Sequence, residues 1–370
     1  MKTRDFDFRF GPTPCRTEVR ADLPTLREAC DYSSGGALVI CDANTENLAR
    51  SFIDGEKGIP LTVLEAGESA KGWSSVEKVL AEAVKAGLGR DGTFIGIGGG
   101  VITDIAAFAA SVYMRGVDLV LLPTTLLAMA DAALGGKTGF DLFGIKNLVG
   151  TFRPADRVIM STDILATLPA REWLSGLAEV VKTAIIGDGE LLDMLEKDSA
   201  AIASGPAACA ASLPDLVARC VAVKGRIVEA DPTETGSERA KLNLGHTYGH
   251  ALESAAGLGV LSHGEAVAWG MARACELGLA LGLTPRERAS RIVGLLAAYG
   301  YATAPLHPAA LAAASGDEDA AAKRLLELMG TDKKKKAGAL RFVVPSFDGA
   351  ALTSVGDIEI ITRTLLGGSR

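Results

Sequence analysis

Apolar and polar positions follow two different patterns along this chain, and the change comes near Thr162. Before it, short apolar runs alternate with segments of helical spacing. The runs at 37–44, 93–100 and 118–125 predict strands, and the segments at 74–88 and 101–116 predict helices. Strands that alternate with helices are typical of an α/β layer with a largely parallel sheet.

Beyond Thr162 the helical pattern dominates. Helices are predicted over 163–186, 214–231, 264–283 and 286–300. The run at 339–345 is the exception and predicts a strand. We therefore expect an α/β domain over residues 1–158 and a mainly α-helical domain over residues 159–370, without internal repeats.

Composition narrows the class of protein. The chain has 370 residues, 48% hydrophobic and 22% charged, with a formal net charge of -7. That charge gives no general attraction to nucleic acid, so no nucleic-acid partner is expected. No uncharged apolar run is long enough for a membrane span. The six cysteines contain no CxxC pair and the first ten residues lack a signal-peptide pattern, so we expect reduced thiols in a cytoplasmic protein.

A glycine-rich turn follows one predicted strand and opens the next helix, in GIGGGVITD. Glycines there let backbone N–H groups approach a pyrophosphate at the positive end of a helix. The order differs from a usual dinucleotide fingerprint, because the acidic residue suited to a ribose, Asp42, lies upstream. A nucleotide site and a tight strand-to-helix turn both fit this stretch.

A second stretch, at 122–147, combines small residues with charged ones. Lys137 and Lys146 lie among glycines, where lysine serves well as a point charge for phosphate. Asn147 follows directly, and Asp131 lies between apolar residues, so partial burial would require a partner for it. Exposed lysines without a ligand remain the alternative here.

Three of the four histidines cluster within a short segment. His246 and His250 are four residues apart, which suits a pair of metal ligands on one helix face, and His263 follows. Glu179 has apolar and small neighbours, unusual for a solvated glutamate. Thr247 stands where the HExxH motif requires glutamate, so a zincin-type hydrolase is disfavoured. The alternative is that these histidines are structural.

Taken together, the motifs resemble the 3-dehydroquinate synthase family of the sugar phosphate cyclases. The resembling stretches include AGESAK, GGGVITDIAAFAASVYMRG, PTTLLAMADAALGGKTG, KNLVGTF, TLPAREWLSGLAEVVK, RAKLNLGHTYGHALE and HGEAVAWGM. They run in the family's order from about Glu65 to Lys334. The resemblance implies an α/β Rossmann-like NAD-binding domain, a mainly α-helical domain and a homodimer.

The resemblance also implies roles for single residues. The metal, zinc or cobalt, would be held by Glu179, His246 and His263, while His250 would face the substrate phosphate instead. Residues matching the NAD site are Asp42, Asn44, Glu68, Lys71, Gly99, Gly100, Val101, Asp104, Thr124, Thr125, Lys146, Thr167, Leu168 and Glu172. Residues matching the catalytic groups are Asp131, Lys137, Lys182, Lys224, Arg239, Asn243 and His250. Further substrate contacts would come from Asn147, Lys333, Lys334 and Arg115, the last from a partner subunit.

The implied reaction is the cyclisation of the sugar phosphate 3-deoxy-D-arabino-heptulosonate 7-phosphate by transient oxidation, phosphate elimination, re-reduction and aldol closure. Departures from the family are Thr103, Ala132, Ala133 and Ile145. Thr103 is shared with relatives that cyclise sedoheptulose 7-phosphate, so such a cyclase is the nearest alternative. A metal-dependent polyol dehydrogenase and an inactive binding protein are the others, although the latter would be expected to lose a metal ligand.

Overall fold

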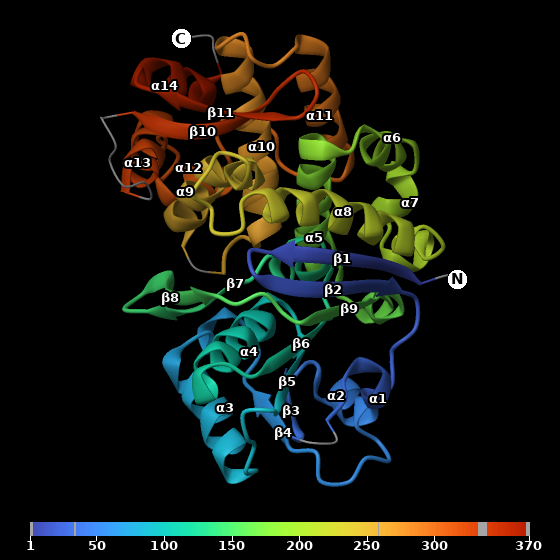
Figure 1. Cartoon of the computed structure of the whole chain (residues 1–370). Helices are drawn as coiled ribbons and strands as arrows, with labels where there is room; N and C mark the ends of the chain where they lie inside the picture. Colours follow the sequence, from blue (N-terminus) through green and yellow to red (C-terminus); the bar gives the residue numbers. More distant parts are fainter. Residues whose placement is uncertain (1–2, 33–34, 258, 332–338, 368–370) are drawn as a thin grey trace. The chain divides into compact units, whose positions relative to one another are not determined.

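The computed structural model describes residues 3–32, 35–257, 259–331 and 339–367 (Figure 1). The chain divides into two compact units. The first comprises Met1–Leu168 with Ala210–Thr233, and the second comprises Pro169–Cys209 with Glu234–Arg370. These units differ in two places from the expected division between residues 158 and 159: they change over after Leu168, and 210–233 returns to the first unit.

The first unit is built on a seven-stranded sheet. Its strands, in spatial order, are β1 (Arg4–Phe10), β2 (Thr13–Arg20), β9 (Arg157–Ser161), β6 (Asp118–Pro123), β5 (Thr93–Gly98), β3 (Ala37–Asp42) and β4 (Leu61–Leu64). Only the β1–β2 hairpin is antiparallel; the other neighbouring pairs are parallel. Every residue of β3 and β5 is buried, as a parallel sheet covered on both faces requires.

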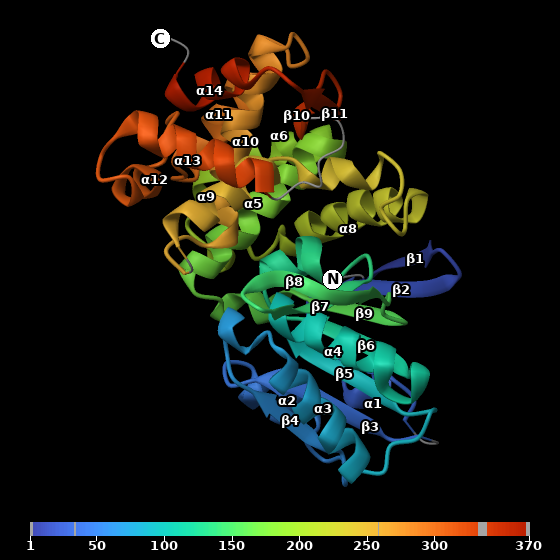
Figure 2. The same cartoon turned by 90° about the vertical axis from the view of Figure 1, so that its left-hand side faces the viewer.

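Helices cover both faces of this sheet (Figures 1 and 2). On one face, α1 (Leu26–Ala29) and α2 (Glu46–Phe52) share an apolar core with alternate residues of β3 and β5. On the other lie α3 (Trp73–Lys85) and α4 (Gly100–Val112), and Gly96 and Gly98 of β5 leave room for α4. The three layers confirm the predicted Rossmann-like fold.

Several shorter elements complete the first unit. They are η1 (Glu68–Ala70), η2 (Tyr113–Arg115), η3 (Ala128–Ala132), the hairpin of β7 (Lys137–Leu142) and β8 (Ile145–Phe152), η4 (Thr162–Thr167) and α8 (Leu213–Ala230). Helix α8 packs on the β1–β2 hairpin, where Gly225 lies so close to the Phe8 ring that a Cβ would overlap it. This close packing joins α8 to the first unit.

The second unit is mainly helical, as predicted. Its elements are α5 (Ala170–Gly187), α6 (Gly189–Lys197), α7 (Ser199–Ala203), η5 (Pro206–Cys209), η6 (Arg239–Asn243), α9 (His246–Ala256), α10 (His263–Ala280), α11 (Arg286–Ala298), α12 (Pro308–Ala313), α13 (Glu318–Thr331), β10 (Leu340–Pro345), β11 (Ala350–Val355) and α14 (Ile358–Leu366). The core around Trp269 joins α9 and α10 to α13, α14 and the β10–β11 hairpin. No helix in the described part of the chain is both long and apolar enough to cross a membrane.

Two glycines let α5, α9 and α10 approach closely. Gly245 precedes α9 with a φ of 82°, and a Cβ there would lie 2.6 Å from the backbone oxygen of Val267 on α10. Gly264, in the first turn of α10, would place a Cβ 2.1 Å from the backbone oxygen of Ser175 on α5. Both contacts are with backbone, which cannot move aside as a flexible side chain can. These positions therefore fix the distances between the three helices.

We expect Gly264→Ala to destabilise the protein by about 1–3 kcal/mol, because the added methyl group forces α10 away from α5. Gly294→Ala is the matched control, since Gly294 is exposed on helix α11 with nothing near its Cβ position. That control should be neutral or stabilising by up to about 1 kcal/mol. Urea unfolding measures both, and equal stabilities for the two variants would contradict the packing argument.

Candidate metal and dinucleotide site

The predicted cofactor residues of the first unit gather at the carboxyl ends of its parallel strands. Asp42 is the last residue of β3, Gly99 and Gly100 follow β5, and Thr124 follows β6. From β3 the chain crosses to β4 on one side, and from β5 it crosses to β6 on the opposite side, so the strand order reverses between the adjacent strands β3 and β5. Open α/β sheets bind ligands in the crevice at such a switch point. Helix α4 begins at Gly100 and adds its positive end there.

Asp42 holds the loop after β3. Its Oδ1 accepts hydrogen bonds from the backbone N–H of Asn44 and of Thr45, both at 3.0 Å, and from the Thr45 hydroxyl at 2.9 Å. The same hydroxyl approaches the backbone oxygen of Ile97 at 3.0 Å, which ties this loop to the end of β5. The turn thus presents Asp42 and Asn44 at the crevice in a fixed geometry.

Lys71 lies at the centre of a second polar group. Its Nζ donates to Asp104 Oδ2 at 2.5 Å and to Asn147 Oδ1 at 2.6 Å. Burial raises the pKa of Asp104 to about 6, although Lys71 opposes that rise. Burial would lower the pKa of Lys71, but the charge and hydrogen bond of Asp104, together with the charges of Glu68 and Asp141, raise it. Asn147, which the resemblance assigns to the substrate, therefore lies with two residues assigned to NAD.

The other residues assigned to NAD are more dispersed. Glu68 begins η1, Val101 lies in the first turn of α4 and Thr125 follows Thr124. Lys146 is exposed on β8. Thr167 and Leu168 end the η4 segment, whereas Glu172 lies on α5 of the second unit.

Asp131 and Lys224 form a partly buried ion pair within the first unit. Lys224 is only 6% exposed, and its ammonium donates to both the backbone oxygen and the carboxylate of Asp131. Asp131 thereby has the partner that its apolar surroundings call for. Lys137 is exposed at the start of β7, and Arg115 is exposed at the end of η2.

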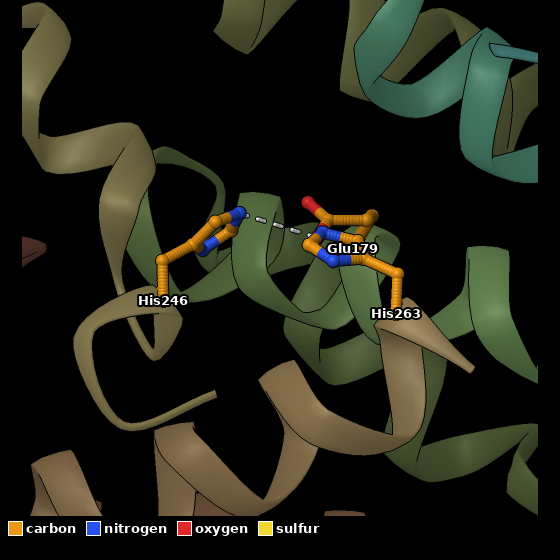
Figure 3. A group of neighbouring side chains, drawn as sticks. All are labelled: Glu179, His246 and His263. Carbon is orange, nitrogen blue, oxygen red and sulfur yellow. Dashed lines mark ion pairs between the residues drawn. The ribbon is translucent and has the colours of Figure 1, made fainter. Parts of the chain in front are cut away.

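Three predicted metal ligands come together in the second unit (Figure 3). Glu179 comes from α5, His246 from the start of α9 and His263 from the start of α10. One donor atom from each lies within 4.8 Å of the others. Oε1 of the fully buried Glu179 is 3.4 Å from Nε2 of His263 and 3.9 Å from Nε2 of His246.

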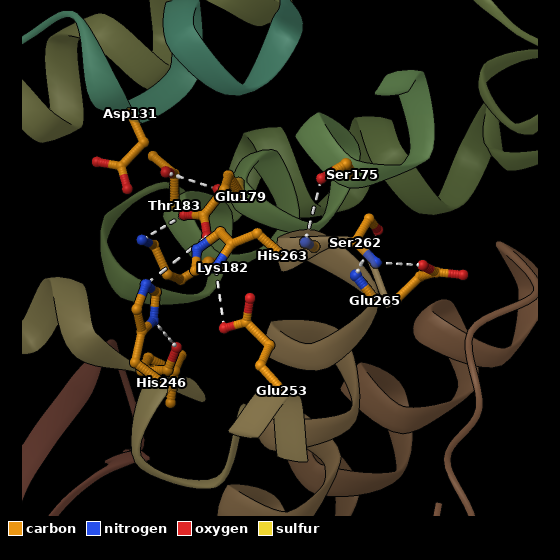
Figure 4. A network of polar contacts seen from close by, with 12 residues as sticks. Asp131, Ser175, Glu179, Lys182, Thr183, His246, Glu253, Ser262, His263 and Glu265 are labelled. Carbon is orange, nitrogen blue, oxygen red and sulfur yellow. Dashed lines mark hydrogen bonds and ion pairs between the residues drawn. The ribbon is translucent and has the colours of Figure 1, made fainter. Parts of the chain in front are cut away.

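The surroundings orient both imidazole rings. Nδ1 of His246 lies 3.2 Å from the backbone oxygen of Leu244, and Nδ1 of His263 lies 3.5 Å from Oε2 of Glu253 (Figure 4). In both rings Nε2 therefore faces Glu179, while Nδ1 faces an acceptor. This is the usual arrangement of metal-ligating histidines.

Charges near the cluster have opposite effects on the two rings. Burial, reinforced by the Lys182 ammonium, lowers the pKa of His246 to about 3. Burial would also lower the pKa of His263, but contacts with Glu179 and Glu253 raise it to about 9. Lys182 itself is 1% exposed and pairs with Glu179 one turn earlier on α5.

This donor set fits a divalent metal. Two imidazole nitrogens and one carboxylate oxygen are the ligands of catalytic zinc sites that keep one position open. The fully buried carboxylate lies among cationic or ionisable groups from three helices, as a ligand held ready for a cation would.

The remaining predicted residues of the second unit lie close to this cluster in sequence. His250 is one turn beyond His246 on α9, with ring centroids 5.2 Å apart. Asn243 ends η6 and donates to Glu234 Oε1 at 3.1 Å, and Arg239 begins the same segment, 3% exposed. Lys333 and Lys334 lie outside the described residues.

Three residues at the site were not anticipated from the sequence. Glu253 faces His263, Glu234 accepts from Asn243, and the Ser175 hydroxyl accepts the backbone N–H of Gly264 at 3.1 Å. Glu253 had a signal, because it lies three residues after His250 and seven after His246 and so shares their helix face. Glu234 and Ser175 had none, since only tertiary packing brings them to the site.

The two units define a class of protein: a dinucleotide-type α/β unit joined to a helical unit with a three-donor metal site. Known proteins of that class match the chain. Residues 61–175 match the 3-dehydroquinate synthase N-terminal family, and residues 176–335 match the C-terminal one. The chain belongs to the 3-dehydroquinate synthase family.

Individual relatives match nearly the whole chain. The 3-dehydroquinate synthase of Pelobacter propionicus is 39% identical, covering 92% of this chain and 91% of its own. That of Paracoccus denitrificans is 41% identical, covering 100% and 98%. Among solved structures, ValA (2-epi-5-epi-valiolone synthase) from Streptomyces hygroscopicus subsp. jinggangensis 5008, with NAD⁺ and Zn²⁺ bound, has a TM-score of 0.77 at 27% identity and covers 98% of both chains.

The geometry of the cluster predicts that zinc binding depends on the ligand Glu179 but not on the neighbouring His250. Glu179→Gln should weaken zinc binding by more than the roughly 10–100-fold typical for loss of an outer-shell partner, because a charged donor is removed. His250→Ala should leave zinc affinity within about threefold of wild type, because the convergent donor set excludes this ring. Competition with a chromophoric chelator measures both, and zinc loss in His250→Ala would overturn the assignment.

Proposed function

We propose that the protein is a 3-dehydroquinate synthase, a carbon–oxygen lyase of the shikimate pathway of aromatic amino acid biosynthesis. It converts 3-deoxy-D-arabino-heptulosonate 7-phosphate to 3-dehydroquinate and phosphate. The observation that carries the proposal is the convergence of Glu179, His246 and His263 in a chain of this family. Relatives of this name, 39–41% identical over nearly the whole chain, support the substrate.

NAD and a divalent metal, zinc or cobalt, are the proposed cofactors. When bound, NAD accepts and returns a hydride at one substrate carbon, and the metal makes the hydroxyl on that carbon more acidic. Asp42, Gly99 and Gly100 at the carboxyl ends of the strands would hold the dinucleotide. Glu179, His246 and His263 would hold the metal. The related ValA structure contains NAD⁺ and Zn²⁺.

The order of steps explains why NAD is needed without net redox change. Oxidation of the substrate hydroxyl to a ketone acidifies the neighbouring C–H, and phosphate then leaves by β-elimination. The ketone is reduced back, the ring opens, and an intramolecular aldol reaction closes the carbocycle. The ring-opened intermediate is flexible, so the residues that hold both ends of the substrate determine the geometry of closure.

Residues that match the family's motifs are proposed to bind those two ends. His250, Asn243, Lys137 and Asn147 would hold the phosphate through charge and hydrogen bonds. A lysine of the segment 333–336, outside the described residues, would join them. Arg239 offers a planar fork to the substrate carboxylate, and Lys224 a second positive charge.

Substrate choice tests the proposal against its nearest alternative. Sedoheptulose 7-phosphate has no carboxylate, so the two buried cations Lys224 and Arg239 would lack the substrate group that they are proposed to bind. Purified protein with zinc and NAD should release phosphate from 3-deoxy-D-arabino-heptulosonate 7-phosphate with no net NADH. Phosphate release only from sedoheptulose 7-phosphate would overturn the substrate assignment. Stoichiometric NADH from a polyol would indicate a dehydrogenase instead.

We further propose that the protein acts as a homodimer in which Arg115 reaches the partner's site. Arg115 is exposed and follows Met114 in left-handed conformation, with φ values of 72° and 49°. Apolar side chains of Met114, Val112 and Phe152 are 42–51% exposed. A hydrogen bond of 2.9 Å between Ser111 and Thr151 joins α4 to β8, which places these apolar side chains on neighbouring elements. Such exposed apolar groups favour self-association.

Subunit complementation tests the dimer. Co-expressed Arg115→Ala and Glu179→Gln chains should recover about a quarter of wild-type activity, because half of random dimers are mixed and each has one intact site. Glu179→Gln with His250→Ala is the control and should recover nothing, because both residues serve the same chain's site. Equal activity of the two mixtures, or a monomer by light scattering, would contradict the proposed dimer.

A further inference from the structure

The His263 ring lies between two carboxylates from different helices. Its Nε2 is 3.4 Å from Glu179 on α5, and its Nδ1 is 3.5 Å from Oε2 of Glu253 on α9. The side chain of Glu253 is 18% exposed, so much of its surface is removed from solvent. Figure 4 shows Glu253 reaching His263 from the side opposite Glu179.

The backbone of His263 is well fixed, but its ring is less so. The capping box of Ser262 and Glu265 begins α10, and the backbone N–H of Gly264 donates a hydrogen bond to the Ser175 hydroxyl. The His263 side chain is nevertheless 31% exposed, against 12% for His246. Packing alone therefore restrains the His263 ring less than the His246 ring, and a polar contact matters more.

The two histidines differ in what faces Nδ1. His246 has the backbone oxygen of Leu244, which the fold supplies whatever the side chains are. His263 has a side-chain carboxylate instead. A carboxylate at Nδ1 selects the tautomer that carries hydrogen there, leaves the Nε2 lone pair toward the metal and increases the ring's basicity.

We propose that Glu253 is the positioning residue of the metal site, acting through His263 to fix its ring orientation and tautomer. The proposal rests on the metal role proposed above for Glu179, His246 and His263. Glu253 itself would not bind the metal or touch the reacting atoms of the substrate. Helix α9 would thus contribute twice to the metal site: His246 as a ligand, and Glu253, two turns later on the same face, through His263.

A competing role for Glu253 is as a direct ligand. Donor atoms of His250, Glu253 and His263 also lie within 4.8 Å of one another, which could suit a second cation. That arrangement would use Nδ1 of His263 as a donor. The two roles differ in stoichiometry, because positioning needs one metal per chain and direct ligation needs two.

Glu253→Met removes the carboxylate and preserves the length of the side chain. We expect zinc affinity to fall about 10–100-fold, as for other outer-shell partners of ligating histidines. Glu253→Gln keeps an oxygen that accepts from Nδ1 and should recover most of that loss. Glu276→Met, on the exposed side of α10, is the control and should bind zinc as wild type does.

Two further readouts separate positioning from general stability. The visible spectrum of the cobalt-loaded protein should shift in Glu253→Met, since the ligand field reports the His263 ring. Thermal unfolding without metal should stay near wild type. If Glu253→Met does not fold, Glu253→Ala, which also removes the acceptor, decides: a cobalt spectrum and zinc affinity identical to wild type would overturn the proposal.

Other outcomes are equally decisive. One zinc per wild-type chain with unchanged affinity in Glu253→Met would overturn the positioning role and leave the proposed function standing. Two zinc ions in wild type, falling to one in Glu253→Met, would make Glu253 a ligand of a second cation. A wild-type chain that binds no zinc or cobalt would instead refute the metal role on which the proposal rests.

Discussion

The fully buried carboxylate of Glu179 constrains the second unit more than any other group. An ionised carboxylate in a protein interior is tolerated only among compensating charges and donors. Lys182 supplies one from the same helix, and His246 and His263 approach from two others. The three helices must therefore pack so closely that their backbones are in contact, which explains why glycine is needed at 245 and 264. The packing of these helices and the chemistry of the site serve the same requirement.

The first unit also has to provide partners for polar residues at its site, and it does so with hydrogen bonds and an ion pair of its own. Its parallel strands end at one edge, where polar residues would be costly to bury without partners. Asp42 satisfies backbone donors of its own turn, and Lys71 joins Asp104 to Asn147. Because Asn147 lies on the β7–β8 hairpin, the two contacts of Lys71 join the hairpin to helix α4 and to the loop after β4. The carboxyl edge of the sheet is thus ordered by its own polar contacts.

The sequence was sufficient for elements whose apolar pattern is set by burial. Strands β3, β5 and β6 were expected from continuous apolar runs, and helices α3 and α4 from apolar residues at helical spacing. The β1–β2 hairpin was missed, although Phe6, Phe8 and Phe10 alternate with charged residues in β1. The β7–β8 hairpin was not expected because glycines and charged residues interrupt its alternation, and β11 is short and mostly half-exposed. Helix α8 was expected, but its membership of the first unit depends on the contact between Gly225 and Phe8, which local pattern does not encode.

The same limit applies to the site, and it shows most clearly in the two histidines of α9. Helical spacing places His246 and His250 on one face, and their rings are 5.2 Å apart. Spacing alone therefore favours a shared metal. The decision comes from a distant residue: Glu179 lies within 4.8 Å of donors on His246 and His263, and that group does not include His250. A metal held by Glu179, His246 and His263 is compatible with the substrate roles proposed for His250 and Asn243, in which one helix start serves both the oxidised carbon and the leaving phosphate.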